Sequence, residues 1–389
     1  MYAFPDLSIE TWGNQNSWLT CDIERCAHAR EDRKAMPAME RNFFEAIALA
    51  DAERVHSQVL AWLFESSLLS ATQKSEILAK LAGIAEDCSK LIVETEYEHI
   101  DVLVETASSI IAIENKIKSA EHGDQLLHYE KALRKKAKSP KLIYLSLCPE
   151  APTRPNWIYR TYDDLHLALS PHIIISPARF EEFAFNEYVD VVGRFVEVVR
   201  AFRADHTQFR NVFTDGGVTK HEKRTRRSGS SPYQDFVRRN QLETPLQRYF
   251  LLEIHKKLLP ACVEYRVEES HGIALLHIVF VKLPIGGREF QWAVQFQGTT
   301  AKLTCSAWDY YKSTPDQLPP EVIKDFESEK SRRQDLRGPN RPRSKAYISL
   351  SMKMKFEWTD SFDHIAESHR SAYEDLSVIG QRLAAKFAS

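Results

Sequence analysis

The chain has 389 residues, more than one hydrophobic core usually holds, so we expect two domains. Hydrophobic residues make up 43% and charged residues 27% of the sequence, a balance that excludes disorder over a whole domain. The formal net charge of -2 excludes a strongly basic protein, so any contact with nucleic acid must come from local basic patches.

The 6 cysteines are scattered without Cys-x-x-Cys pairs, unlike a zinc ribbon or a disulfide framework, and this pattern fits a reducing cytoplasm. The first residues lack a basic segment followed by an apolar run, and no apolar stretch of about 18 residues occurs. We therefore expect a cytoplasmic protein that is neither exported nor inserted in a membrane.

The first half alternates helical and strand patterns, as an α/β core does. Apolar residues recur at helical spacing over 42–64, where Asp51 as an internal cap would divide the run into two helices. Three strands, a helix and a fourth strand are predicted next, over 91–97, 99–105, 110–117, 124–137 and 141–147. A unit of this order can bury one face of its sheet under its helices.

A long helix is predicted over 180–203, and apolar periodicity stops between 205 and 231, where a basic stretch is typical of a flexible linker. We therefore divide the chain into a first domain (1–204), a linker (205–231) and a smaller α+β domain (232–389). In that last domain we predict helices near 245–259 and 362–387, and strands near 262–267, 273–283, 290–297 and 346–352.

The second and third strands predict a hairpin with chemistry on one face. If residues 106–109 form its turn, Glu105 faces Ile110, and counting outward places Asp101 opposite Glu114. Lys116 lies on the same face because strand side chains alternate, whereas three isoleucines of its strand point to the other face.

Opposed residues in an antiparallel pair have Cβ atoms about 5 Å apart, and like charges there repel, so Asp101 and Glu114 favour a bound cation. Oxygen ligands with room for water suit Mg²⁺, which polarises a phosphoryl oxygen and lowers the pKa of bound water. Lys116 would orient that water or stabilise negative charge, so the pattern predicts phosphodiester hydrolysis. The alternative is a solvated strand, because Glu-x-Lys is frequent on such strands.

The flanking sequence resembles the PD-(D/E)XK nuclease superfamily, in particular a bacterial group in which an Ile-Glu-Asn-Lys-Ile strand precedes a Gln-Leu-x-x-Tyr helix. These stretches are residues 113–117 and 125–129 here, and residues 53–57 resemble the group's Glu-x-x-His-Ser helix. The resemblance extends to a Tyr-Asp-Asp-Leu stretch at 162–165. It implies a restriction-endonuclease-like α/β core, with the order α-β-β-β-α-β in a mixed sheet, followed by a smaller α+β domain.

The resemblance also implies roles for single residues. Asp101 and Glu114 would bind Mg²⁺, for which Mn²⁺ would substitute, and the backbone carbonyl of Asn115 would complete the metal site. Lys116 would act at the attacking water. The implied activity is a metal-dependent nuclease acting on DNA, with RNA left open, in restriction, phage defence or DNA repair.

Two more catalytic residues follow from the resemblance. Glu53 is implied as a further ligand of the metal or of water, and Gln125 as a residue that steadies the site. From spacing alone, Glu53 shares a helix face with His56 and Ser57, and the alternative is a polar helix surface. The family's proline before the aspartate is absent, since Ile100 stands there.

Two basic runs are candidate nucleic-acid contacts, with solvated surface as the alternative: Arg134, Lys135 and Lys136, then Arg337, Arg341 and Arg343. His99 is expected to contact phosphate or a ligand of the metal rather than Mg²⁺ itself, because Mg²⁺ prefers oxygen. The aromatic residues Trp308, Tyr310 and Tyr311 could stack on bases, although core packing fits aromatic residues better.

The competing hypothesis is a catalytically silent nuclease-fold adaptor that binds nucleic acid or protein. Homo-oligomerisation, a protein partner, and a small signalling ligand at the C-terminal domain stay open. No phosphate-binding loop or Gly-x-Ser-x-Gly turn occurs, so neither ATP use nor serine hydrolase chemistry is predicted.

Overall fold

The computed structural model describes residues 41–388, apart from positions 122, 137, 139, 215–230, 259–263, 271, 308–316 and 343–344. The described cysteines, Cys88, Cys148 and Cys305, are buried free thiols. None of the described helices is long and apolar enough to cross a lipid bilayer. The aromatic residues Trp308, Tyr310 and Tyr311 lie outside the described residues.

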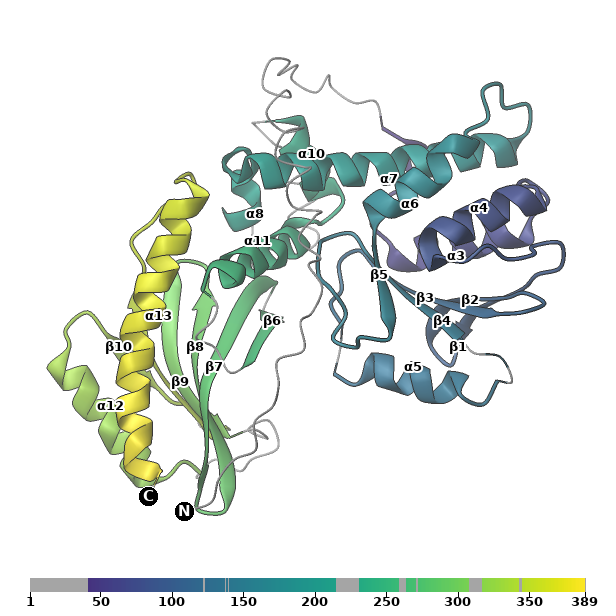
Figure 1. The fold of residues 1–389 in the computed structure, drawn as a ribbon. Coiled ribbons are helices and arrows are strands. Elements are labelled where there is room, and N and C mark those ends of the chain that lie inside the picture. Colours follow the sequence, from purple (N-terminus) through teal and green to yellow (C-terminus); the bar gives the residue numbers. More distant parts are fainter. Residues whose placement is uncertain are drawn as a thin grey trace, which may run out of the picture. The chain divides into compact units, whose positions relative to one another are not determined.

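The first half is built on a mixed sheet of five strands in the order β1-β2-β3-β4-β5 (Figure 1). An antiparallel meander of three strands is followed by two strands parallel to the third: β1 (Ile92–Tyr97), β2 (Ile100–Glu105), β3 (Ile110–Lys116), β4 (Pro140–Ser146) and β5 (Trp157–Thr161). The mixed sheet agrees with the predicted core. β5 was not predicted, because it is short and four of its five side chains are only half-buried, which leaves no apolar run.

Helices cover both faces of this sheet, with α5 on one face and α3, α4 and α6 on the other (Figure 1). The helices of this part are α2 (Phe43–Ala46), α3 (Glu53–Glu65), α4 (Ala71–Ala82), α5 (Gln125–Leu133), α6 (Tyr162–Leu169) and α7 (Phe180–Ala204), with a 3₁₀ turn η1 (Ser170–His172). The run 42–64 is split as predicted, but Asp51 is not the cap, since Ala52 precedes α3. The carboxylate of Asp51 instead accepts hydrogen bonds from Lys118 and Gln241.

The predicted hairpin register is confirmed, because Glu105 pairs with Ile110 and Val102 with Ile113. One further step places Asp101 opposite Glu114. All seven residues of β3 are buried. The face predicted to carry chemistry is therefore also a packed face, since Leu126 and Leu133 of α5 join the same hydrophobic cluster as Leu103 and Ala112.

Residues 206–214 differ from the predicted linker, because they form η2 (His206–Phe209) and α8 (Arg210–Thr214). Phe209 and Val212 are fully buried, and the Phe209 ring lies 5.2 Å from that of Phe202. Phe209, Val212 and Phe213 have helical spacing over a single turn, which is too short a run to predict a helix but is enough to dock a short one. The basic stretch 220–230 lies outside the described residues.

The second half holds an antiparallel sheet of six strands in the order β10-β11-β9-β8-β7-β6. These strands are β6 (Glu264–Ser270), β7 (Ile273–Ile285), β8 (Arg288–Gln297), β9 (Thr300–Ala307), β10 (Arg337–Asn340) and β11 (Tyr347–Lys353). Its helices are α10 (Pro232–Arg239), α11 (Glu243–Leu258), α12 (Pro320–Arg332) and α13 (Phe362–Ala384), with a final 3₁₀ turn η4 (Ala385–Phe387). The α+β character agrees with the prediction, which lacked β9, β10, α10 and α12.

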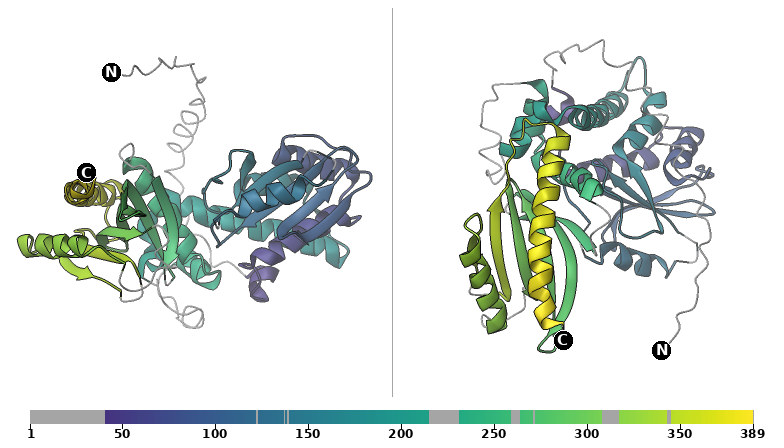
Figure 2. Two further views of the ribbon diagram at one scale, coloured as in Figure 1. Left: turned by 90° about the horizontal axis from the view of Figure 1, so that it is seen from below. Right: turned by 60° about the vertical axis from the view of Figure 1, so that its left-hand side comes forward.

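The helix α13 lies lengthwise on one face of this sheet (Figure 2), and α12 packs on the same face. The ring of Phe296 on β8 lies 4.8 Å from that of His369 on α13, and Trp292 lies 5.8 Å from Phe326 on α12. Close packing of α13 requires a small residue at Gly380, where a Cβ atom would overlap Phe280 and Leu303.

We expect Gly380→Ala to lower the free energy of unfolding by about 2 kcal/mol, because overpacking outweighs the better helix propensity of alanine. Gly193→Ala in α7 is the matched control, since the three atoms nearest to its Cβ all belong to the half-buried imidazole of His166, which can turn away. Thermal and urea unfolding of both variants measure the difference. Equal stability of the two variants would contradict the packing of α13 described here.

Candidate active site

Asp101 on β2 and Glu114 on β3 form an acidic pair at one end of the hairpin. Glu114 is 2% exposed, and the Oδ2 atom of Asp101 accepts a hydrogen bond of 2.7 Å from the backbone N–H of Asn115. Burial, followed by the negative charge of Asp101, raises the pKa of Glu114 to about 8. Burial likewise raises the pKa of Asp101 to about 6, against the hydrogen bond from Asn115. The pair therefore favours a proton or a cation beside it.

Lys116 and Gln125 hold the acidic pair from the side. Lys116 Nζ lies 2.7 Å from Glu114 Oε1 and 3.2 Å from Gln125 Oε1. Gln125 Nε2 donates to Glu114 Oε1 at 3.0 Å and to the Tyr129 hydroxyl at 2.7 Å. The Tyr129 hydroxyl in turn donates to the backbone carbonyl of His99 at 2.7 Å. Gln125 and Tyr129 act together because residues four apart share one helix face.

The donor set fits a hard divalent cation. Glu114 Oε2 is buried, and none of the described residues donates a hydrogen bond to it. An unsatisfied buried carboxylate oxygen is costly, and a metal ion would satisfy it. Within the described part of the chain, no group of three or more His, Cys, Asp and Glu side chains is arranged to hold a metal. Two carboxylates, a backbone carbonyl such as that of Asn115, and water are the ligands that would hold Mg²⁺ here.

Glu53, which we expected at the metal, is used differently. Its Oε1 atom accepts hydrogen bonds from the backbone N–H groups of Ile117, Lys118 and Ser119 at 2.8, 2.5 and 2.7 Å, and its Oε2 atom accepts one from the Ser119 hydroxyl. Burial acts to raise the pKa of Glu53, but these hydrogen bonds outweigh it and lower the pKa. The structure thus brings Glu53 to the end of β3, with its oxygens already engaged.

The Asn115 side chain points away from the acidic pair. Its amide donates to the Glu53 carbonyl at 3.2 Å and to Ser57 Oγ at 3.3 Å, and its Oδ1 atom accepts from the Tyr162 hydroxyl at 2.8 Å. His56 is fully buried, and burial lowers its pKa to about 4, so it is neutral at pH 7. The Glu-x-x-His-Ser helix and Tyr162 therefore fix β3 from the face opposite the acids. Sequence reasoning noted these motifs but did not find this contact.

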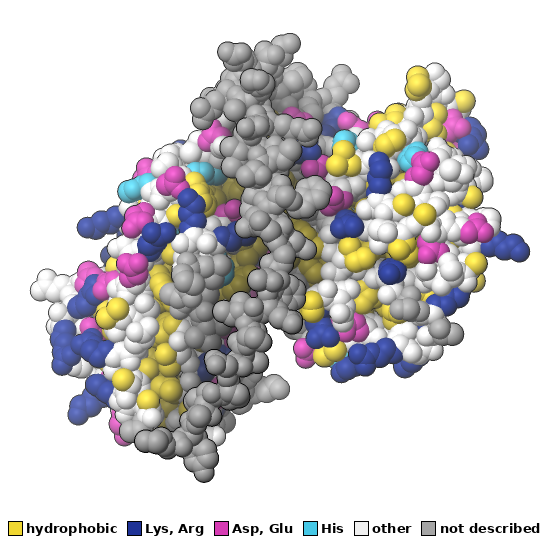
Figure 3. All heavy atoms as spheres, viewed as in Figure 1, with side chains coloured by type: hydrophobic (Ala, Val, Ile, Leu, Met, Phe, Trp, Pro, Cys, Tyr) yellow, Lys and Arg dark blue, Asp and Glu magenta, His cyan; other side chains and the backbone are white. Residues whose placement is uncertain are grey.

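The basic residues are placed unequally. Lys136 makes ion pairs with Glu94 and Glu105 and lies over the ring of Tyr97, whereas Arg134 and Lys135 are exposed at the end of α5. Lys and Arg side chains gather over α12 (Figure 3), and Arg337 and Arg341 nearby in the chain are exposed. Arg343 lies outside the described residues. His99 is exposed in the turn between β1 and β2.

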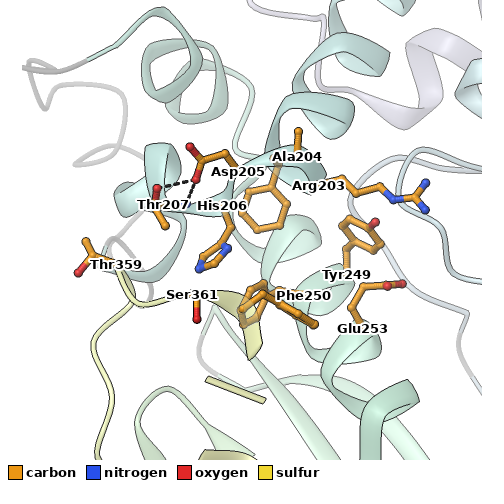
Figure 4. Close-up of a pocket in the computed structure, with 12 residues that line it drawn as sticks. Arg203, Ala204, Asp205, His206, Thr207, Tyr249, Phe250, Glu253, Thr359 and Ser361 are labelled. Carbon is orange, nitrogen blue, oxygen red and sulfur yellow. Dashed lines mark hydrogen bonds between the residues drawn. The ribbon is translucent and has the colours of Figure 1, made fainter. Parts of the chain in front are cut away.

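A cavity of about 580 Å³ lies where the end of α7, α11 and the start of α13 meet (Figure 4). Aromatic side chains line it together with a few polar ones, among them Phe202, Tyr249, Phe250, Phe362, Arg203 and Glu253. None of the residues expected to be catalytic lines this cavity. Its volume lies in the range of small-molecule sites.

We expect Asp101→Asn to stabilise the metal-free protein, because the raised pKa values mean that ionising the pair opposes folding. When folding raises the pKa of a carboxyl, the folded protein becomes less stable as the pH rises above the pKa of that group in the unfolded chain. For Glu114 this loss develops between its ordinary pKa of 4.5 and its folded pKa of about 8. At about pH 8 with EDTA, the variant should gain about 1 to 2 kcal/mol in the free energy of unfolding. Urea unfolding measures this gain.

The gain should shrink at about pH 5, where a proton already neutralises the pair, and Mg²⁺ should stabilise the wild type more than the variant. An identical difference between the two proteins at both pH values would contradict the coupled acidic pair.

Comparison with known proteins agrees with this architecture. Residues 41–190 match the family model described as PD-(D/E)XK nuclease superfamily, a range that contains the five-stranded sheet and ends within α7. No match was found among curated proteins or among solved structures. The resemblance seen in the sequence is thereby confirmed over residues 41–190, which are similar to the PD-(D/E)XK nuclease superfamily.

Proposed function

We propose that this chain is a nuclease that hydrolyses phosphodiester bonds in DNA with Mg²⁺, for which Mn²⁺ substitutes. One observation carries the proposal. The carboxylates of Asp101 and Glu114 share one buried face, both with raised pKa values, and Glu114 Oε2 has no hydrogen-bond donor among the described residues. Such a pair needs a cation, and the superfamily of residues 41–190 supplies the chemical context.

The residues of the site would have separate roles in the reaction. A bound Mg²⁺ supplies Lewis acidity toward the phosphate and lowers the pKa of bound water. Asp101 and Glu114 would hold the ion, and the Asn115 carbonyl would complete its protein ligands. Lys116, 2.7 Å from Glu114, is held at the edge of the pair, where its ammonium can orient the attacking water or neutralise developing charge. Gln125 keeps Lys116 and Glu114 in place, because it accepts a hydrogen bond from Lys116 and donates one to Glu114.

DNA is the proposed substrate on the strength of the superfamily, and RNA is an outcome of the test. The same argument supports a setting in restriction, phage defence or DNA repair. The cavity beside α11 gives room to a small ligand, which would make activity depend on a signal.

A catalytically silent adaptor is the second candidate, and one observation favours it. Lys116 already occupies Glu114 Oε1, and Glu53, the third carboxylate expected at the metal, is engaged by the segment after β3. A site closed in this way would bind nucleic acid without cutting it.

Cleavage of plasmid DNA, single-stranded DNA and RNA with millimolar Mg²⁺ separates the two candidates. We expect Glu114→Gln and Lys116→Ala each to lower the cleavage rate by about 100-fold or more, because the first removes a ligand of the metal and the second removes the ammonium beside the attacking water. Glu105→Gln, on the same strand face as Asp101 but paired with Lys136 and Lys138, is the matched control and should cut normally.

Cleavage that survives both substitutions would exclude this site. Tight binding of nucleic acid without cleavage by the wild type, with either metal, would favour the adaptor.

The exposed basic residues at the end of α5 should contact the phosphate backbone. The double variant Arg134→Ala/Lys135→Ala is expected to weaken DNA binding and to reduce the salt dependence of the binding constant by about one unit of slope per lost contact. Binding titrations at several salt concentrations measure this slope. The pair Arg337→Ala/Arg341→Ala tests the second sheet in the same way, and Arg370→Ala on α13 is the control. If both double variants show the same salt dependence of DNA binding as Arg370→Ala, neither pair of basic residues contacts the phosphate backbone.

A further inference from the structure

The segment Ile117–Ser119 leaves β3 directly after Lys116 and is held from two sides. On one side, Glu53 accepts three of its backbone N–H groups. On the other side, Arg248 on α11 donates from Nη1 to the Lys118 carbonyl at 2.6 Å and from Nη2 to the Ser119 carbonyl at 3.0 Å. The peptide group between Lys118 and Ser119 therefore lies between a carboxylate at its N–H and a guanidinium at its C=O. Each charge polarises this peptide group in the sense that strengthens the other hydrogen bond.

Arg248 also reaches the chain that leaves β4. It is 3% exposed, and its Nε atom lies 3.5 Å from Glu150 Oε2. Because β3 and β4 are parallel, their carboxyl ends lie at the same edge of the sheet, where Lys116 pairs with Ser146. One guanidinium thus contacts the segments that follow both strands.

A second contact ties the same segment to the turn between α10 and α11. Lys118 Nζ lies 2.8 Å from Asp51 Oδ2, and Gln241 Nε2 donates to the same carboxylate oxygen at 2.7 Å. Arg248 and Gln241 both lie outside residues 41–190, which match the superfamily. The second half of the chain therefore supplies part of the support for the end of β3.

We propose that Arg248 is a positioning residue of the active site, a role that rests on the proposed nuclease function. By holding the carbonyls of Lys118 and Ser119, it fixes the end of β3 and with it the place of Lys116 beside Glu114. The planar guanidinium suits this task, because its fork of donors spans two successive carbonyls, which a single ammonium cannot do. A small displacement of a catalytic group costs a large factor in rate.

The first test is hydrogen exchange of the full chain, which does not require activity. Arg248→Met should speed exchange of the amides of Ile117, Lys118 and Ser119, while the amides of the second sheet stay protected. Arg333→Met is the matched control, because the Arg333 guanidinium is likewise held by two partners, the carboxylates of Asp335 and Asp375, which lie far along the chain from the segment after β3. It should leave exchange at 117–119 unchanged.

The second test is cleavage kinetics of the same proteins. Arg248→Met should lower kcat by about 10- to 100-fold with little change in KM, as loss of a group that orients a catalytic residue does. Arg248→Lys should retain an intermediate rate, since one ammonium reaches one carbonyl, and it keeps the buried positive charge if Arg248→Met fails to fold. A purely stabilising residue would instead lower Tm and speed exchange throughout the chain.

Unchanged hydrogen exchange at 117–119 in both Arg248 variants would overturn the proposal. A decrease in kcat that is fully explained by the fraction of unfolded protein would overturn it as well. If the wild type cuts no substrate, the proposed function fails, but exchange still decides whether Arg248 holds this segment. Selective exchange there supports the positioning role, and uniform exchange contradicts it.

Discussion

The repulsion between the half-buried carboxylate of Asp101 and the buried carboxylate of Glu114 is the constraint on which the site depends. Two acids on one packed sheet face cannot both ionise without a compensating charge, so the pKa of each is raised. Lys116 and the amide of Gln125 compensate one oxygen of Glu114 and leave the other without a donor among the described residues. Ionising the pair therefore opposes folding, and the cation that we propose there would offset this cost.

Because the acids repel each other, the strand that carries Glu114 must be held firmly. Asn115 anchors β3 from the opposite face through Ser57 and Tyr162, and α5 covers the acidic face through apolar packing. The end of the strand is held by Glu53 and by Arg248, which comes from the second half of the chain. Support of this kind would keep the proposed metal site in shape when the ion is absent.

Sequence reasoning found what depends on local pattern. The alternation of side chains and the turn at 106–109 were enough to place Glu105 opposite Ile110, and hence the two acids together. Three-dimensional contacts without a periodic signal were missed. Nothing in a helix pattern shows that Glu53 would turn to three backbone N–H groups. Arg248 is separated by 130 positions from Lys118, so no spacing links them. The short strand β5 shows no apolar run, because four of its five side chains are half-buried. The helices α4 and α12 were missed although their buried residues recur at helical spacing.

Anomalous diffraction from crystals grown with Mn²⁺ would show whether Asp101 and Glu114 hold a metal ion together. We expect one ion about 2.1 to 2.2 Å from carboxylate oxygens of both residues, with Glu114 Oε2 among its ligands. An ion held by Glu114 alone, or no ion at the pair at millimolar Mn²⁺ while Lys116 keeps its contact with Glu114, would contradict it.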